Sequence, residues 1–314
     1  MASIPGAGRF GAVVTAMVTP FDDSGALDIE GAVTLARWLT AHGSDGLVVA
    51  GTTGEAPVLS EAELAVLWRA VAGAVTVPVI AGTGTNDTRD SIHLTKVATE
   101  AGVDGILVVT PYYNRPSQHG LADHFAAVAD STPLPVLLYD IPVRAGRKIA
   151  HETLLRLARA VPNIVGVKDA AGDVPGTART VAEAPDGFEV YCGDDNLALA
   201  LLAVGAVGLV SVASHWAGVE LGQMVTAFTK GEVETARWLN ARLIESYEFE
   251  SSDTHPNPLP AKAACRALGL PAGQCRLPLG AAAPELDGQA RLVISRLGHG
   301  PGGASDTRPG GPLA

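Results

Sequence analysis

Eight short apolar segments recur along the chain, and their spacing restricts the fold more than any other sequence feature. The segments are apolar throughout instead of alternating with polar residues, which is typical of parallel strands covered on both faces. Successive segments begin about 20 to 35 residues apart, which is the length of one strand–loop–helix unit. They comprise residues 12–17, 46–50, 77–81, 105–110, 136–139, 164–168, 188–192 and 208–212.

Helical patterns fit between these segments, with apolar residues recurring at spacings of three and four. Because eight such units would fill about 220 residues, we predict an α/β fold of the (β/α)8 TIM-barrel type. A doubly wound open sheet is the alternative, since strand order cannot be determined from one sequence. We favour the barrel because the count of segments stops at eight. The helical patterns between the segments span residues 28–42, 60–74, 87–101, 120–129 and 151–160.

Further helical patterns follow the eighth apolar segment. We therefore expect a catalytic barrel in residues 1–225 and a C-terminal helical appendage in residues 226–298. Residues 299–314 are rich in Gly and Pro, which predicts a disordered tail. The helical patterns after the eighth segment span roughly residues 219–229, 233–248, 260–268 and 286–297.

The composition excludes several classes of protein. Hydrophobic residues make up 47% of the chain and charged residues 18%, which indicates a folded protein. The formal charge of −11 disfavours binding to nucleic acids or to an acidic membrane surface. The three cysteines are too few and too scattered for a disulfide framework or a metal site, and the N-terminal residues lack the pattern of a signal peptide. We therefore expect a cytoplasmic protein.

One stretch, residues 197–219, contains no Asp, Glu, Lys or Arg and is long enough to span a bilayer. Its flanks argue against insertion, because Asp195 and Glu220 are acidic and no basic residue anchors either end. Gly205 and Gly208 also divide it into an Ala/Leu-rich part and a β-rich part. We therefore expect a buried helix followed by a buried strand.

Lys168 ends the sixth apolar segment. In a barrel, this position lies at the carboxyl end of a strand, where the catalytic groups of barrel enzymes lie. Lysine is seldom buried without a function, and its amine can add to a substrate carbonyl as a Schiff base. The alternative is a structural lysine whose chain extends from the rim to solvent. The other four lysines lie in helical or loop contexts, which favours the functional interpretation.

Polar residues also follow three other apolar segments. The loop at residues 51–55 reads GTTGE, and its backbone N–H groups and hydroxyls could hold a carboxylate or a phosphate. A plain strand-to-helix turn is an equally good interpretation of that loop alone. Tyr112, Tyr113 and Tyr139 end the fourth and fifth segments and are three of the five tyrosines in the chain. Their clustering favours a function over buried structural hydroxyls.

Five motifs occur in order at the ends of the second, fourth, fifth, sixth and seventh segments. They are GTTGE, TPYYNRPSQ, YDIPVRAG, VGVKDA and YCGDD. On these motifs the chain resembles, from residue 18 to residue 278, the pyruvate-dependent class I lyases of the dihydrodipicolinate synthase and N-acetylneuraminate lyase family. The resemblance implies a (β/α)8 barrel that acts on pyruvate and a small aldehyde without a metal or other cofactor. It also implies a homotetramer built as a dimer of dimers.

The resemblance further implies roles for individual residues. Lys168 would form the Schiff base with the pyruvate ketone, and Tyr139 would act beside it as general acid and base. Thr52, Tyr139 and Tyr113 match the family's proton relay, in which Tyr113 reaches in from a neighbouring subunit. Thr53 matches the contact to the pyruvate carboxylate. A non-catalytic barrel used as a regulator or scaffold would be expected to have lost some of four residues, all of which are present: Lys168, Tyr139, Thr52 and Arg144.

Arg144, Gly193 and Val210 match residues that the family places around its substrates. Arg144 would hold the carboxylate of the aldehyde substrate, because a guanidinium pairs with a carboxylate through two hydrogen bonds. Gly193 and Val210 would contribute backbone carbonyls near the amino group and the bound imine. This set is most similar to members that condense pyruvate with L-aspartate 4-semialdehyde to 4-hydroxy-tetrahydrodipicolinate, towards diaminopimelate and lysine. An N-acetylneuraminate lyase or sugar-acid aldolase is the alternative, although a sugar aldehyde offers Arg144 no carboxylate at that end.

Some residues depart from the family pattern. Asp140 stands where many members have Asn, and Val143 replaces a small or polar residue, so both bear on the choice of aldehyde. In lysine-sensitive members, His residues lie on the helix after GTTGE, whereas residues 56–64 contain no His here. We therefore predict weak or absent inhibition by lysine.

Overall fold

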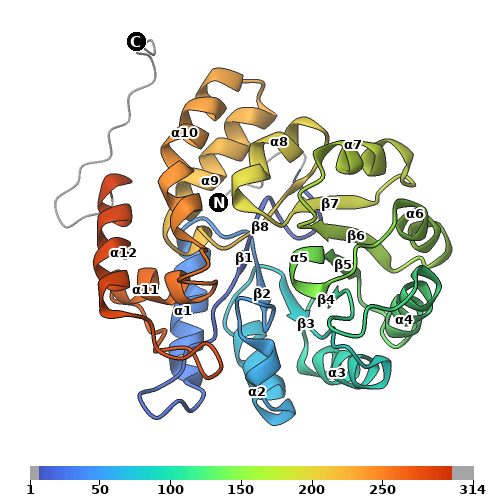
Figure 1. The fold of residues 1–314 in the computed structure, drawn as a ribbon, viewed down its shortest axis with the longest axis horizontal. Helices are drawn as coiled ribbons and strands as arrows, with labels where there is room; N and C mark the ends of the chain where they lie inside the picture. The colour runs from blue at the N-terminus through green and yellow to red at the C-terminus, as the bar shows by residue number, and fades with distance from the viewer. Residues whose placement is uncertain (1–6, 299–314) are drawn as a thin grey trace.

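The computed structural model describes residues 7–298, which contain a closed barrel of eight parallel strands (Figure 1). Each strand pairs with the next one along the chain, and β1 pairs with β8, where Val14 lies opposite Val210. The predicted (β/α)8 barrel is therefore confirmed, and the open-sheet alternative is wrong. The strands are β1 (Val13–Ala16), β2 (Gly46–Val49), β3 (Val79–Gly82), β4 (Gly105–Val109), β5 (Val136–Asp140), β6 (Ile164–Asp169), β7 (Glu189–Cys192) and β8 (Gly208–Ser211).

Helices surround the barrel, and the last ones lie outside this ring (Figure 1). Helix α12 packs against α10 and α11, and α10 packs against α9. The predicted tail, residues 299–314, lies outside the described residues. The helices are α1 (Ile29–Ala41), α2 (Glu61–Ala72), α3 (Thr88–Ala101), α4 (Gln118–Asp130), α5 (Pro142–Ala145), α6 (His151–Ala160), α7 (Val174–Glu183), α8 (Ala198–Ala203), α9 (Ser214–Thr229), α10 (Val233–Phe249), α11 (Leu259–Ala267) and α12 (Pro284–Arg296), with 3-10 turns η1 (Ala56–Val58) and η2 (Asp195–Leu197).

Sequence signals determine where several helices begin and end. Ser60 and Glu63 form a capping box at the start of α2, in which the Glu63 carboxylate accepts the Ser60 N–H at 2.8 Å. Gly102 ends α3 with a φ of +85°, which a residue without a Cβ adopts without strain. Because such signals are local, the predicted helices here end close to the observed ones.

Two helices are not predicted by the sequence pattern, namely α5 and α7. Helix α7 contains Gly176, which lowers its intrinsic helix propensity, and Pro175, which the first turn of a helix tolerates. It forms because Asp173 caps its first turn, where the Asp173 carboxylate accepts the Gly176 N–H at 3.0 Å. Helix α9 spans Ser214–Thr229 and is kinked at Ala217, so its continuous part begins close to the predicted start at residue 219. This part runs through the expected domain boundary at residue 225.

The core consists of two apolar clusters. The inner cluster fills the barrel, and the outer cluster packs the strands against the surrounding helices. Burying a large apolar side chain contributes about 1.5–3 kcal/mol, so both faces of the strands are held firmly. The inner cluster comprises Phe10, Val14, Ala16, Val48, Ile80, Leu107, Leu137, Tyr139, Ile141, Ala170, Tyr191 and Val210.

Residues 197–219 fold into the predicted buried helix and strand, α8 and β8, followed by the start of α9. Within residues 7–298, none of the helices combines the length and the hydropathy that crossing a membrane requires.

Candidate active site

Lys168 and Tyr139 lie together at the carboxyl end of the barrel. Lys168 is on β6 and Tyr139 on β5, and the two residues are adjacent in the strand register. The Lys168 Nζ atom lies 4.2 Å from the centroid of the Tyr139 ring. Only 5% of Lys168 and 4% of Tyr139 is exposed, so the amine and the phenol share a site that largely excludes water.

Gly193, directly after β7, leaves room for the Lys168 side chain. A Cβ atom on Gly193 would lie 3.1 Å from Cε of Lys168 and 2.8 Å from Cβ of Ala170. A larger residue at this position would therefore displace the lysine chain. Val210 lies buried on β8, in the same inner cluster as Tyr139. Of the two positions expected to offer backbone carbonyls, Gly193 thus lies beside the lysine, and Val210 lies on another strand of the same barrel interior.

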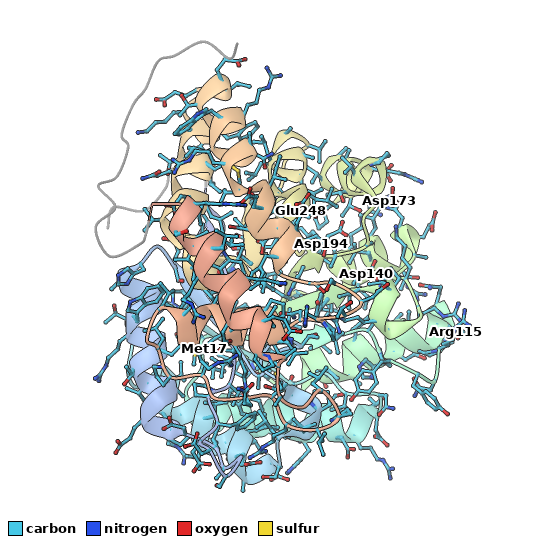
Figure 2. The ribbon with its side chains drawn as sticks, turned by 60° about the vertical axis from the view of Figure 1, so that its left-hand side comes forward. Met17, Arg115, Asp140, Asp173, Asp194 and Glu248 are labelled. Carbon is cyan, nitrogen blue, oxygen red and sulfur yellow. The ribbon has the colours of Figure 1, made fainter. Side chains whose placement is uncertain are left out.

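Arg144 and Asp194 bring opposite charges to the same end of the barrel. Arg144 is exposed on α5, which directly follows β5. Asp194, which is labelled in Figure 2, comes two residues after the end of β7. Burial raises the pKa of Asp194, and the cations of Lys168 and Arg144 oppose that rise. Asp194 therefore lies within electrostatic range of both cations. An exposed guanidinium in this position can bind a substrate carboxylate.

Asp140, which is labelled in Figure 2, follows Tyr139 at the end of β5 and is buried. Burial raises the pKa of Asp140 to about 7. The Ile149 N–H, which donates to Oδ1 at 3.1 Å, opposes this rise, as does the Lys148 cation, while the Asp169 carboxylate adds to it. The residue that follows Tyr139 in the chain thus carries a carboxyl group that changes charge near neutral pH.

The loop after β2 has a strained backbone. Ala50 and Glu55 adopt left-handed φ angles of +58° and +56°, which are costly for residues with a Cβ. Thr53 is buried, and its Oγ1 accepts a hydrogen bond from Nδ2 of Asn257 at 3.0 Å. Thr52, beside it, is half-buried. Strain held in place by surrounding contacts is common at functional sites, which favours a function for this loop over a plain turn.

Tyr113 is not brought to the lysine within one chain. It is 89% exposed in the loop after β4 and has a left-handed φ of +73°. Its neighbour Tyr112 is half-buried, and burial raises the pKa of the Tyr112 phenol. Of the residues expected to form the relay, the chain alone therefore joins only Tyr139 directly to Lys168.

Two polar residues at this end are not singled out by the sequence patterns. Asn257 lies 204 positions from Thr53, so no local pattern could connect them. The signal in the sequence is limited to its position between Pro256 and Pro258, which indicates an ordered turn. Asp194 lies in the YCGDD motif, so the motif is the sequence signal that could have identified Asp194 as a site residue.

The arrangement suits the addition of an amine to a carbonyl group. A buried lysine beside a phenol supplies a nucleophile and a proton donor. The loop at residues 51–55 offers hydroxyl and N–H groups to one anion, and Arg144 offers a guanidinium to a second. These groups fit substrates that carry a carbonyl and carboxylates.

Comparison with known proteins places the whole barrel and the appendage in one group of relatives. The model of the dihydrodipicolinate synthetase family matches residues 9–296. The chain is 48% identical over 275 residues to the 4-hydroxy-tetrahydrodipicolinate synthase of Bacillus subtilis, covering 86% of this chain and 93% of the relative. It is 50% identical over 292 residues to the protein of that name from Moorella thermoacetica, covering 92% and 99%. The crystal structure of the dihydrodipicolinate synthase of Cyanidioschyzon merolae, with lysine bound, has a TM-score of 0.90 at 42% identity and covers 93% and 99%.

Proposed function

The chain belongs to the dihydrodipicolinate synthetase family, and from that membership we propose that it is a lyase of lysine and diaminopimelate biosynthesis. The reaction is the condensation of pyruvate with L-aspartate 4-semialdehyde to 4-hydroxy-tetrahydrodipicolinate. The observation that carries the chemistry is the buried Lys168 amine, which ends a barrel strand 4.2 Å from the Tyr139 ring.

The proposed reaction begins at Lys168. The amine adds to the ketone carbon of pyruvate, and loss of water gives an iminium ion. The iminium nitrogen withdraws electrons, so a proton leaves the methyl group and an enamine forms. The Tyr139 phenol donates and accepts protons in these steps. The iminium ion formed on Lys168 accepts these electrons, so the proposed chemistry requires no metal or other cofactor.

The enamine carbon then attacks the aldehyde carbon of the second substrate, which forms the new carbon–carbon bond. The amino group of that substrate displaces Lys168 from the adduct, which closes the ring and regenerates the enzyme. Thr53 and the N–H groups of its loop hold the pyruvate carboxylate, and Arg144 holds the carboxylate of the aldehyde. The carbonyls of Gly193 and Val210 accept hydrogen bonds from the amino group and the imine.

The proposed assembly is a cytoplasmic homotetramer in which Tyr113 completes the relay of a neighbouring subunit with Thr52 and Tyr139. The support for a shared site is the 89% exposure of Tyr113, which leaves its phenol on the surface of the single chain. The support for a reducing compartment is that all three cysteines are buried free thiols.

Borohydride trapping tests the Schiff base. Wild-type protein incubated with pyruvate and borohydride should gain the mass of one reduced pyruvate adduct on Lys168. Lys168→Ala should keep the fold but lose both the adduct and the turnover. Lys148→Ala, which removes an exposed lysine after the same barrel strand as Tyr139, serves as the matched control and should retain both.

Coupled reduction of the product tests the second substrate. Turnover with L-aspartate 4-semialdehyde would support the complete reaction. Trapping of pyruvate without such turnover would keep the Schiff-base chemistry and reject the aldehyde, and sugar-acid aldehydes would be tried next. An active Lys168→Ala variant would overturn the mechanism.

A further inference from the structure

A buried ion pair joins the C-terminal helical region to the loop after β2. The Nζ atom of Lys262, on α11, lies 2.6 Å from Oε1 of Glu55, and each side chain is only 1% exposed. Lys262 also donates to the carbonyl of Gln274 at 2.9 Å and lies 4.2 Å from the centroid of the Phe21 ring. The lysine is thus fixed on several sides and directed at the last residue of the GTTGE loop.

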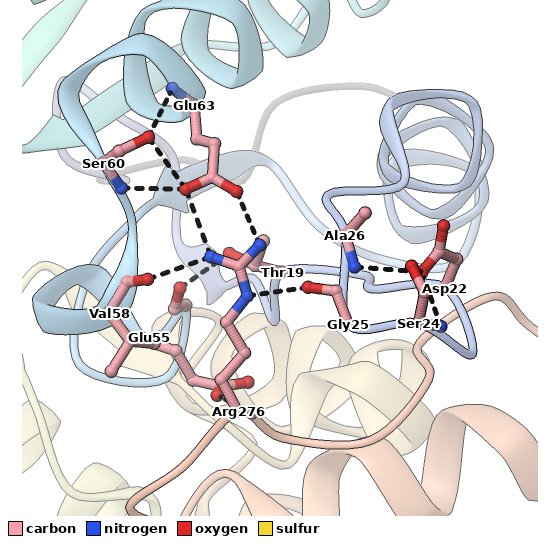
Figure 3. Close-up of polar contacts among 11 residues, drawn as sticks. Thr19, Asp22, Ser24, Gly25, Ala26, Glu55, Val58, Ser60, Glu63 and Arg276 are labelled. Atoms are coloured by element: carbon pink, nitrogen blue, oxygen red, sulfur yellow. Dashed lines mark hydrogen bonds and ion pairs between the residues drawn. The ribbon is translucent and has the colours of Figure 1, made fainter.

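Further contacts from the same region surround this loop. The second carboxylate oxygen of Glu55 accepts a hydrogen bond from the backbone N–H of Arg276 at 2.9 Å. The Arg276 guanidinium donates to the carbonyls of Gly25 at 2.8 Å and Val58 at 2.9 Å, and it pairs with Glu63 (Figure 3). One C-terminal side chain therefore ties the residues that follow the loop to the connection between β1 and α1.

The loop needs such support because its backbone is strained. Ala50 and Glu55, at its two ends, have left-handed φ angles that are costly for residues with a Cβ and persist only where the surroundings enforce them. Between them lies Thr53, whose Oγ1 accepts a hydrogen bond from Asn257 in the segment before α11. Since that bond occupies Oγ1 as an acceptor, the hydroxyl hydrogen of Thr53 remains available to donate to an anion.

Stability alone does not account for the ion pair. Two charges removed from water lose much of their hydration, and replacing a buried pair with apolar side chains of similar volume is often neutral or stabilising. A charged pair does fix a distance and a direction, which an apolar contact does not. A pair at one end of a strained loop is therefore suited to setting where the loop's hydroxyl and N–H groups point.

We propose that Lys262 is a positioning residue, whose ion pair with Glu55 holds Thr52 and Thr53 in the geometry that binds pyruvate. The inference rests on the proposed function, because it assumes that these threonines bind and activate pyruvate. It makes α11, which lies outside the ring of barrel helices, a functional part of the site. Lys262 itself does not contact the substrate and acts through the loop.

The test compares single and double neutral substitutions. Lys262→Met alone leaves the Glu55 charge buried without its partner and is expected to lower Tm. Glu55→Gln combined with Lys262→Met leaves no lone buried charge, and the amide oxygen can still accept the Arg276 N–H. Asp287→Asn is the matched control, because it breaks the ion pair between Arg266 of α11 and α12, away from the loop.

We expect the double variant to keep a Tm close to that of the wild type but to raise KM for pyruvate by about 10-fold or more, since small misplacements of binding groups are costly. Borohydride trapping should slow by a similar factor at low pyruvate, and KM for the aldehyde should change little. The control should keep both values. A double variant with wild-type KM and trapping rate, or a loss of activity no larger than that of the control, would overturn the inference. If wild-type protein itself traps no pyruvate, the proposed function fails, whatever the variants do.

Discussion

Replacing Asp140 by asparagine should make the stability of the chain less dependent on pH. Asp140 is 6% exposed, and its Oδ1 accepts the Ile149 N–H at 3.1 Å. The amide oxygen of asparagine has the same shape and can accept the same hydrogen bond. The substitution therefore removes the ionisable group while changing the packing little.

The size of the effect follows from the pKa of the buried carboxyl. Burial raises the pKa of Asp140 from 3.8 to about 7. A tenfold change in proton affinity corresponds to about 1.4 kcal/mol, so ionisation of Asp140 in the folded chain costs about 4 kcal/mol. In the unfolded chain the same group ionises near pH 4 without this cost.

Because the pKa of Asp140 is higher in the folded than in the unfolded chain, wild-type stability should fall as the pH rises. Below about pH 4, Asp140 is protonated in both states and does not affect the free energy of unfolding. Between about pH 4 and pH 7, the unfolded chain releases its proton while the folded chain retains it, so wild-type stability falls as pH rises. Above about pH 7 the destabilisation is complete. Asp140→Asn should therefore gain stability relative to the wild type as pH rises through this window.

Urea unfolding at a fixed protein concentration, measured at steps from pH 5 to pH 8, would test this prediction. We expect the difference in unfolding free energy between Asp140→Asn and wild type to grow by about 2–3 kcal/mol over that range. Asp186→Asn, which neutralises an exposed carboxylate, is the control and should show no comparable growth. Parallel curves for wild type and Asp140→Asn would refute the reasoning.

Three other outcomes are expected from the proposed site. Arg144→Ala should raise KM for the aldehyde by about 10- to 100-fold and leave KM for pyruvate almost unchanged, because a hydrogen bond to a charged group contributes about 1.5–3 kcal/mol; equal changes in both KM values would contradict its role. The Tyr113→Phe and Lys168→Ala variants should each be inactive alone. If Tyr113 acts across a subunit interface, oligomers that contain both kinds of subunit should recover activity. Mixed oligomers as inactive as the two separate variants would exclude a role of Tyr113 in a neighbouring subunit. L-lysine should inhibit the enzyme weakly or not at all in a steady-state assay. Half-inhibition by sub-millimolar L-lysine would show that the absence of His from residues 56–64 does not determine the sensitivity to lysine.

The sequence by itself determined the strands and singled out Lys168, the lysine that we propose as the nucleophile. A strand buried on both faces must be apolar along its whole length, so the eight segments are visible without any knowledge of their partners. Lys168 and Tyr139 stand out because each ends such a segment with a polar atom. The capping box of α2 is likewise contained within four consecutive residues, Ser60 to Glu63.

Only the tertiary structure decided which of these residues meet. Closure of β1 onto β8 excludes the open sheet, and no single segment encodes it. The hydrogen bond from Asn257 to Thr53 and the ion pair of Lys262 with Glu55 join elements that are distant in sequence. The burial of Asp140 depends on how the helices cover the barrel. Local patterns report which face of an element is buried, whereas the partner of a side chain depends on how the whole chain closes around it.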